Sequence, residues 1–310
     1  MSAAKMTASI VLFNTPRTQI EAVVKSISGS GCVGTLYVID NSPDDRWRIL
    51  EKDFPSVRYI HNANLGYGAS HNLAIREAVE SGSVYHVVLN PDIRFGAEVL
   101  PFLADFMEKH PRAGYVLPKV VYPDGTVQYL CKLLPTPGDL IFRRFVPPVG
   151  FLKKWKERRD SRYCLKDSGY SRVMNPPCLS GCFMFMRLSV LAENNIFFDD
   201  RFFMYFEDFD LIRRLHRVSQ TLYCPDVSVV HDHARESYKS RKLLAAHIRS
   251  AVRYFGKYGW LFDRERREMN GRVLREIGEE GKTPQHNGQR TRRVHQRRVR
   301  RGCAASDAWI

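Results

Sequence analysis

Residues 87–95 read VVLNPDIRF, an apolar run that changes abruptly into polar residues. The run completes a segment that starts at Val84, and its β-branched composition is typical of a buried strand. Asn90 and Asp92 follow it directly, so we expect them at the carboxyl edge of a sheet, where open α/β sheets bind their ligands. Their oxygens could hold a hard divalent cation, and an ordinary Asn-Pro-Asp turn is the alternative.

Similar β-branched runs precede this strand and alternate with segments of helical periodicity. The earlier runs cover residues 9–13, 35–39 and 57–60. The helical stripes comprise Ile20, Val23, Val24 and Ile27, and later Val99, Phe102, Leu103 and Phe106. Each stripe has i, i+3, i+4, i+7 spacing, so each helix has one apolar face. The alternation predicts βαβ units around a mainly parallel sheet, with both helices packed on it.

The second half of the chain breaks this alternation. The runs VVY and TVQY flank Pro123, Asp124 and Gly125, which predicts an antiparallel hairpin and therefore a mixed sheet. Residues 131–175 are rich in basic and aromatic residues without core periodicity. We interpret this segment as a basic aromatic insert at the surface, or as a lid.

Core patterns return after the insert. They occur in LSGCFMFMR (residues 179–187), in VSVVH (227–231) and in the helical stripe Leu244, Ile248, Ala251 and Phe255. We expect one α/β domain over residues 1–263 that closes near Trp260 with a C-terminal helix. Residues 264–310 form an arginine-rich tail that we predict to be disordered, because most of it has little apolar content to offset its ordering entropy.

Composition limits the class of protein. A chain of 310 residues with 44% hydrophobic content can bury one sizeable core. No stretch has the roughly 20 apolar residues of a membrane span, and the start has no signal-peptide pattern, so we expect a cytoplasmic protein. The seven cysteines show no disulfide-framework spacing and are expected to be reduced. The net charge of +15 implies an anionic partner.

Further polar clusters could carry chemistry. The segment FFMYFEDFDL opens a helix at Glu207 and Asp208, either of which could deprotonate an acceptor hydroxyl, although acidic residues also simply stabilise helix starts. His231 ends the VSVVH strand and could bind a divalent metal, while a structural histidine is the common alternative.

Other segments suit a nucleotide. NANLGYGASHN (residues 62–72) places glycines and small polar residues before a helix, where backbone N–H groups could approach a nucleotide or its phosphates. Asp40 closes the strand of YVIDNS, where its carboxylate could accept from a ribose hydroxyl or a base, or form an Asx turn.

Together and in this order, the segments resemble glycosyltransferase family 2, and within it the bacterial rhamnosyltransferase branch. The resemblance covers roughly residues 8–260. It rests on IVLFN, VIDNS, NANLGYGASHN, LNPD, LSGCFMFMR, FFMYFEDFDL and VVHDHARESYKS, followed by HIRSAVRYFGKYG. It implies a GT-A fold, in which a Rossmann-like nucleotide half joins an acceptor half through a mixed sheet with helices on both faces.

The resemblance also implies roles for matching positions. Donor contacts fall on Phe13, Asn14, Asp40, Asn64, Gly66 and Asn72. Asp92 matches the last acid of the metal-binding DxD motif, whereas Asn90 replaces its first acid and is expected to contact ribose or phosphate. His231 matches a histidine often found on the metal. Asp208 matches the general base, with Glu207 as the other candidate.

A glycine is expected to complete the donor site. Gly181 matches the floor of the site, where a missing side chain would let the sugar approach, and plain packing is the alternative.

The expected activity is inverting transfer of L-rhamnose from dTDP-L-rhamnose to a glycan or lipid-linked saccharide in cell-surface polysaccharide synthesis. The expected cofactor is Mn²⁺ or Mg²⁺. Another UDP- or GDP-sugar donor, a non-catalytic nucleic-acid-binding protein and an inactive scaffold are the alternatives.

The insert suggests a further partner. It interleaves aromatic with basic residues, a pattern suited to the anionic inner face of the cytoplasmic membrane. These residues are Phe142, Phe145, Phe151, Trp155, Arg143, Arg144, Lys153, Lys154 and Lys156.

Overall fold

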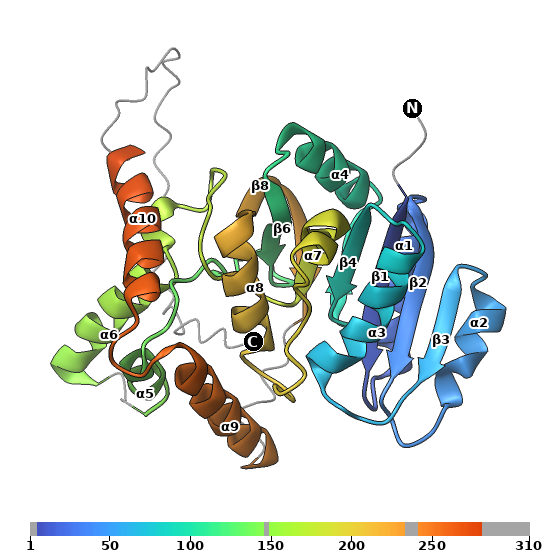
Figure 1. Cartoon of the computed structure of the whole chain (residues 1–310), viewed down its shortest axis with the longest axis horizontal. Helices are drawn as coiled ribbons and strands as arrows, with labels where there is room; N and C mark the ends of the chain where they lie inside the picture. The colour runs from blue at the N-terminus through green and yellow to red at the C-terminus, as the bar shows by residue number, and fades with distance from the viewer. Residues whose placement is uncertain (1–4, 146–148, 233–240, 281–310) are drawn as a thin grey trace.

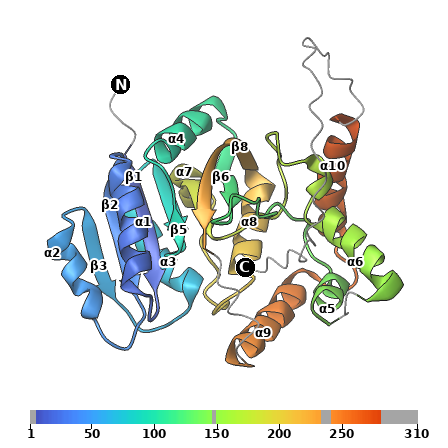
Figure 2. The ribbon, with the colours of Figure 1, turned by 180° about the vertical axis from the view of Figure 1, so that it is seen from behind.

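A computed structural model describes residues 5–145, 149–232 and 241–280. An eight-stranded mixed sheet runs through the molecule in the order β3-β2-β1-β4-β7-β6-β8-β5. Helices cover both faces of it: α3, α7 and α8 lie on one face, and α1 and α4 on the other (Figures 1 and 2). The predicted α/β class with a mixed sheet and helices on both faces is confirmed.

The strands divide the sheet into two parts. Parallel strands β1 (Met6–Leu12), β2 (Val33–Asp40), β3 (Val57–His61) and β4 (Tyr85–Leu89) build the first part. In the second part, β7 (Phe183–Arg187) is antiparallel to both β4 and β6 (Ala113–Val121), and β6 is parallel to β8 (Gln220–His231). The two-residue strand β5 (Ile93–Arg94) pairs antiparallel with the end of β8.

The α-helices connect these strands and extend beyond the sheet. They are α1 (Arg17–Gly29), α2 (Leu50–Asp53), α3 (Tyr67–Glu80), α4 (Val99–Lys109), α5 (Pro137–Phe145), α6 (Gly150–Tyr163), α7 (Leu188–Glu193), α8 (Glu207–Val218), α9 (Arg241–Tyr258) and α10 (Arg264–Glu280). Short 3₁₀ turns occupy Arg46–Ile49 and Lys166–Ser168. None of the helices in the described residues is long and apolar enough to span a bilayer.

The strand and helix patterns of the first hundred residues are confirmed. The predicted runs coincide with β1 to β4, and the α1 stripe of Ile20, Val23, Val24 and Ile27 is fully buried. The α4 stripe is wrong at Phe102, which is 38% exposed, because the helix turns Leu100 and Met107 inward instead. The expected turn after β6 forms as well, with an antiparallel bridge between Val121 and Val127.

The insert is only partly a surface element. Helices α5 and α6 project beside α9 and α10, at a distance from β1 to β3 (Figure 1). The flanking segments are part of the core, because Cys131, Cys164, Leu165 and Tyr170 are buried in the main hydrophobic cluster. Lys156, one of the predicted membrane-facing cations, is also buried.

The predicted disorder from residue 264 is wrong for residues 264–280. Helix α10 occupies this segment, and its Met269 and Val273 are buried against the rest of the chain. The packed part of the chain therefore includes residues 264–280. The arginine-rich residues 281–310 lie outside the described residues.

Candidate active site

The candidate site lies at the carboxyl edge of the sheet. Asp40 and His231 end β2 and β8, and Asn90 follows β4. Because β7 runs in the opposite direction, its start lies at this edge too, and Asn90 N donates to Cys182 O over 2.9 Å. The sheet thus brings together polar segments that are far apart in sequence.

Strand β5 positions Asp92 beside His231. Ile93 pairs with His231 across the β5–β8 ladder, and Asp232 N donates to Asp92 O over 3.1 Å. As a result, Asp92 Oδ1 lies 3.4 Å from His231 Nε2, and both side chains are largely buried.

Gln128 sets the orientation of the His231 ring. Its Nε2 donates to His231 O over 2.8 Å, which leaves its Oε1 facing His231 Nδ1 at 2.9 Å. Because a carbonyl oxygen only accepts, Nδ1 must carry a proton, and in the neutral ring Nε2 then presents its lone pair toward Asp92. Such orientation by an outer partner is typical of metal-ligating histidines.

The pair fits a divalent cation with an incomplete protein ligand set. Asp92 Oδ1 has no hydrogen-bond partner among the described residues. The same residues contain no group of three or more His, Cys, Asp or Glu side chains arranged for a metal, so phosphate oxygens and water would supply the other ligands. Burial lowers the pKa of His231 while Cys182 and Asp92 raise it, with a net rise, so a ligating imidazole must first lose a proton.

Two further carboxylates reach the edge from α8. The turn before this helix is strained, since Tyr205 and Phe206 both have a φ of +67°. Their rings are buried in an aromatic cluster with Tyr254 and Phe255 of α9, which holds the turn in place. The turn presents Glu207 and Asp208, which are 5% and 3% exposed.

Asp208 is held against the start of β7. Gly181 N donates to Asp208 Oδ2 over 3.1 Å, and Phe209 N donates to Asp208 Oδ1 over 2.8 Å. A Cβ atom at position 181 would lie 2.9 Å from the Asp208 Cβ, closer than side-chain carbons pack. The missing side chain of Gly181 therefore admits Asp208, and the predicted approach of the sugar to this glycine stays a prediction.

Burial raises the pKa of both carboxyls. For Glu207 the neighbouring Asp208 adds to burial, and its pKa is well above the usual value. For Asp208 the charge of Lys132 and the N–H groups of Phe209 and Gly181 partly offset burial, although the net direction is still upward. Glu207 Oε2 has no hydrogen-bond partner among the described residues.

Tyr67 connects the two halves of the site. Its hydroxyl donates to Asn90 Oδ1 over 2.8 Å and also lies 3.2 Å from Gly181 O. Its backbone N–H donates to Phe203 O over 2.9 Å. The helix that follows β3 is thereby joined to the loops that carry Asn90, Gly181 and the α8 turn.

A family model described as glycosyl transferase family 2 matches residues 10–208, which include most of this edge. The chain belongs to glycosyltransferase family 2.

Curated relatives of this family-2 chain include two rhamnosyltransferases. An N-acetylglucosaminyl-diphospho-decaprenol L-rhamnosyltransferase of Mycobacterium tuberculosis (strain ATCC 25618 / H37Rv) is 29% identical over 233 residues, which are 70% of this chain and 73% of the relative. Rhamnosyltransferase WbbL of Escherichia coli (strain K12) is 25% identical over 237 residues, 70% of this chain and 85% of WbbL.

Solved structures share the fold. TarS of S. aureus superposes with a TM-score of 0.53 at 16% identity over 88% of this chain, which spans 42% of TarS. The mannosyltransferase PcManGT from Pyrobaculum calidifontis, in complex with GDP-Man and Mn²⁺, superposes with a TM-score of 0.52 at 14% identity, covering 90% of this chain and 76% of its own.

The residues that we predict to contact the donor in this family-2 chain differ in accessibility. Phe13 is 55% exposed after β1, and Asn14 and Asn64 are also exposed at this edge. Asp40 is buried, and its carboxylate accepts from Ser42 N over 2.9 Å and from Tyr59 OH over 2.8 Å. These bonds shape the loop after β2, and the contact of Asp40 with a nucleotide stays a prediction.

Asn72 and Gly66 also have structural contacts. The Asn72 amide donates to Phe198 O and Asp200 Oδ1 and accepts from Phe198 N. Gly66 has a φ of +109°, and a Cβ atom there would collide with the backbone of Phe203. Both residues therefore fasten α3 to the segment before α8, and their contact with the donor stays a prediction.

Sequence reasoning missed Tyr67, Gln128 and Lys132. The signal for Lys132 was available, since a single lysine within LCKLL has apolar neighbours on both sides and is 1% exposed. Tyr67 lies inside a quoted motif, but only its contact with Asn90 shows its function. Gln128 gave no local signal, because its partner His231 is distant in sequence.

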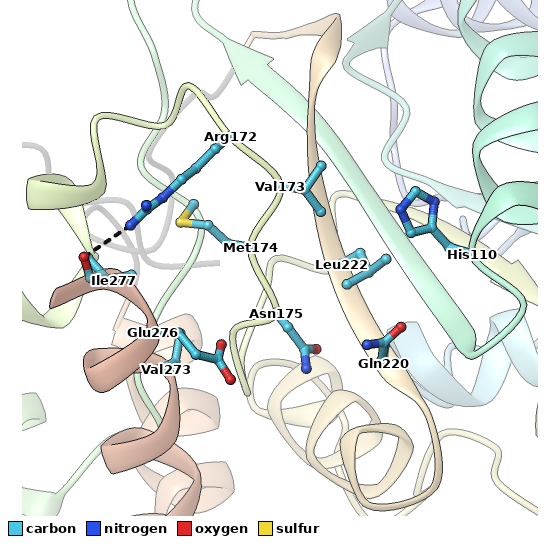
Figure 3. Close-up of a pocket in the computed structure, with 10 residues that line it drawn as sticks. All are labelled: His110, Arg172, Val173, Met174, Asn175, Gln220, Leu222, Val273, Glu276 and Ile277. Atoms are coloured by element: carbon cyan, nitrogen blue, oxygen red, sulfur yellow. Dashed lines mark hydrogen bonds between the residues drawn. The ribbon is translucent and has the colours of Figure 1, made fainter. Parts of the chain in front are cut away.

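A pocket of about 220 Å³ lies elsewhere, at the amino ends of β6 and β8 (Figure 3). His110, Gln220 and Glu276 line it, and Arg172 donates to Ile277 O of α10. Because the candidate catalytic residues lie at the opposite strand ends, this pocket is not part of the candidate active site.

Proposed function

We propose that this family-2 enzyme is a metal-dependent, inverting rhamnosyltransferase that uses dTDP-L-rhamnose. One observation carries the proposal: the Asp92–His231 pair and the Glu207–Asp208 pair lie at the same sheet edge. The backbone just before β7 links the loop of Asp92 to Asp208, because Cys182 O accepts from Asn90 N and Gly181 N donates to Asp208 Oδ2. The distant identity to two rhamnosyltransferases supports the choice of sugar.

Asp208 suits the role of general base. Lys132 and two backbone N–H groups stabilise its ionised form, whereas Glu207 has no comparable stabilisation and a more strongly raised pKa. A base must be ionised to accept the proton of the attacking hydroxyl. Attack opposite the leaving diphosphate inverts the anomeric centre in one step.

Asp92 and His231 would hold the cation. When bound, it would stabilise the negative charge that develops on the departing nucleotide diphosphate. Gln128 keeps the His231 ring oriented, and Tyr67 holds the Asn90 Oδ1, so the Asn90 amide N–H₂ is the group left to face a ribose or phosphate oxygen.

The acceptor is proposed to be a saccharide on a lipid diphosphate. The Mycobacterium tuberculosis relative is named for such an acceptor. Lys153, Lys154 and Trp155 of α6 are exposed and suit contact with an anionic inner membrane surface. The side chains of Arg143, Arg144, Phe145 and Phe151 lie outside the described residues.

A donor comparison tests the proposal. The enzyme with Mn²⁺ and a lipid-linked acceptor is incubated separately with dTDP-L-rhamnose, a UDP-hexose and a GDP-hexose, and the product is analysed by NMR. We expect transfer from dTDP-L-rhamnose with an inverted anomeric configuration, and loss of transfer in Asp208→Asn. Preferred transfer from a UDP- or GDP-sugar would show that dTDP-L-rhamnose is not the donor. A product with retained anomeric configuration would contradict the inverting mechanism.

A further inference from the structure

An open apolar groove lies between α5 and α9. Its volume is about 170 Å³, and Leu140, Ile141, Ile248, Val252, Phe255 and Trp260 are among its lining residues. Ile248, Val252 and Trp260 remain 47–50% exposed. Leu261 and Phe262, which follow directly, are 77% and 86% exposed. Exposed apolar side chains concentrated in one place indicate a binding surface.

One groove residue packs against the turn before α8. The ring of His247, a groove residue, lies 5.1 Å from that of Tyr205 and 5.4 Å from that of Phe206. These two residues form the strained turn that presents Glu207 and Asp208. A molecule in the groove would therefore be separated from this turn by the His247 ring.

The positive charge of α9 indicates which kind of molecule the groove can bind. Helix α9, RKLLAAHIRSAVRYFGKY, contains no acidic residue, and Lys242, Arg249 and Arg253 are exposed along it. An apolar chain attached to an anionic group complements this combination. The chain's own segment 281–310 does not, because it is arginine-rich and has the same sign of charge.

We propose that the α5–α9 groove binds the apolar chain of a lipid-diphosphate-linked acceptor. This inference rests on the proposed function and specifies where the non-sugar part of the acceptor lies. Binding the chain here would place the diphosphate near the basic flank of α9 and direct the saccharide toward Asp208. The groove would then select acceptors by chain length.

Direct binding to the full-length protein tests the inference. The probes are farnesyl diphosphate and methyl diphosphate, measured by calorimetry with Mn²⁺ and dTDP present. Wild type is expected to bind the farnesyl compound at least about tenfold more tightly, since burying a few CH₂ groups suffices for such a difference. The Ile248→Ser, Val252→Ser double variant should lose this preference.

Val218→Ser is the matched control, because Val218 is an equally exposed helical valine (49%) outside the groove. It should retain the preference. Equal affinity of wild type for both probes, or a preference that survives the double variant, would overturn the inference. A third result would also overturn the inference: wild type shows no preference for the farnesyl compound, and the double variant no longer binds phosphatidylglycerol vesicles. The groove would then contact the bilayer itself. Stabilisation by Mn²⁺ and dTDP reports the proposed function separately.

Discussion

Glu207, Asp208 and Asp210 are similar carboxylates within one turn of α8, and their surroundings give them different properties. Asp210 is fully buried and engaged by Arg214, Lys257 and the Tyr258 hydroxyl, which ties α8 to α9. Asp208 is held by backbone N–H groups at the site, and Glu207 Oε2 has no hydrogen-bond partner among the described residues. The sequence alone left all of them as possible helix-start residues.

The raised pKa of Glu207 predicts a pH-dependent cost to folding. A carboxyl whose pKa is higher in the folded than in the unfolded state stabilises the protein at low pH, where it is protonated. This contribution to the free energy of unfolding is lost as the pH rises through the folded-state pKa. Glu207→Gln removes this cost. Its free energy of unfolding should therefore exceed that of wild type increasingly from pH 5 to pH 8, by about 1.4 kcal/mol per unit of pKa shift. Urea unfolding across this pH range measures the difference, and a constant or shrinking difference would contradict the assignment.

Lys132 should control the ionisation of Asp208. Its side chain is buried, and its charge lowers the pKa of that carboxyl. Lys132→Met removes the charge at similar volume, so the acidic limb of the kcat/KM profile should move up by roughly one to two pH units. Glu207, Tyr67, Tyr115 and Cys178 also face Asp208 electrostatically and remain unchanged.

A variant that keeps the charge of Lys132 distinguishes its effect on the Asp208 pKa from a role in packing. Lys132→Arg retains the charge and should leave the acidic limb near its wild-type position. If Lys132→Met lowers activity equally at every pH, Lys132 only supports the packing and does not tune the base.

At the scale of elements, β5 and α10 show what local patterns cannot reveal. A two-residue strand has no periodicity, yet the β5–β8 pairing is what places Asp92 beside His231. Helix α10 is highly charged, and this composition predicts disorder. It is ordered through tertiary contacts, which include Val273 in the core and an ion-pair network with α8.

The network between α8 and α10 predicts a large stability effect. Arg213 is 1% exposed, and its guanidinium pairs with the equally buried Asp263 at 2.7 Å. Arg213→Ala leaves this carboxylate without its main partner, so we expect a loss of about 3–5 kcal/mol in the free energy of unfolding. Arg264→Ala is the control, because the Arg264–Glu268 pair is exposed to solvent and contributes little to stability. Comparable losses of unfolding free energy in the two variants would contradict the stabilising role of the buried Arg213–Asp263 pair.

For the whole molecule, the alternating pattern predicted the architecture well, because strand and helix periodicities depend on neighbouring residues. The edge that carries the candidate site was also predictable, since the residues that we predicted for it follow strands at their carboxyl ends. The sequence did not predict contacts between residues that are distant along the chain. Examples are Tyr67 with Asn90, Gln128 with His231, and Asn72 with Phe198. Such pairs depend on the register of the assembled sheet.

The central claim is that Asp92 and His231 bind a cation together with a nucleoside diphosphate. Thermal unfolding with Mn²⁺ and dTDP, UDP or GDP, in wild type and in Asp92→Ala, tests it most directly. At about 100 times the Kd, a bound ligand raises stability by about 2.7 kcal/mol, so the melting temperature should rise by on the order of 5 °C. We predict this rise for Mn²⁺ plus dTDP and its loss in Asp92→Ala. No rise with any nucleotide, or a rise that survives in Asp92→Ala, would contradict the account.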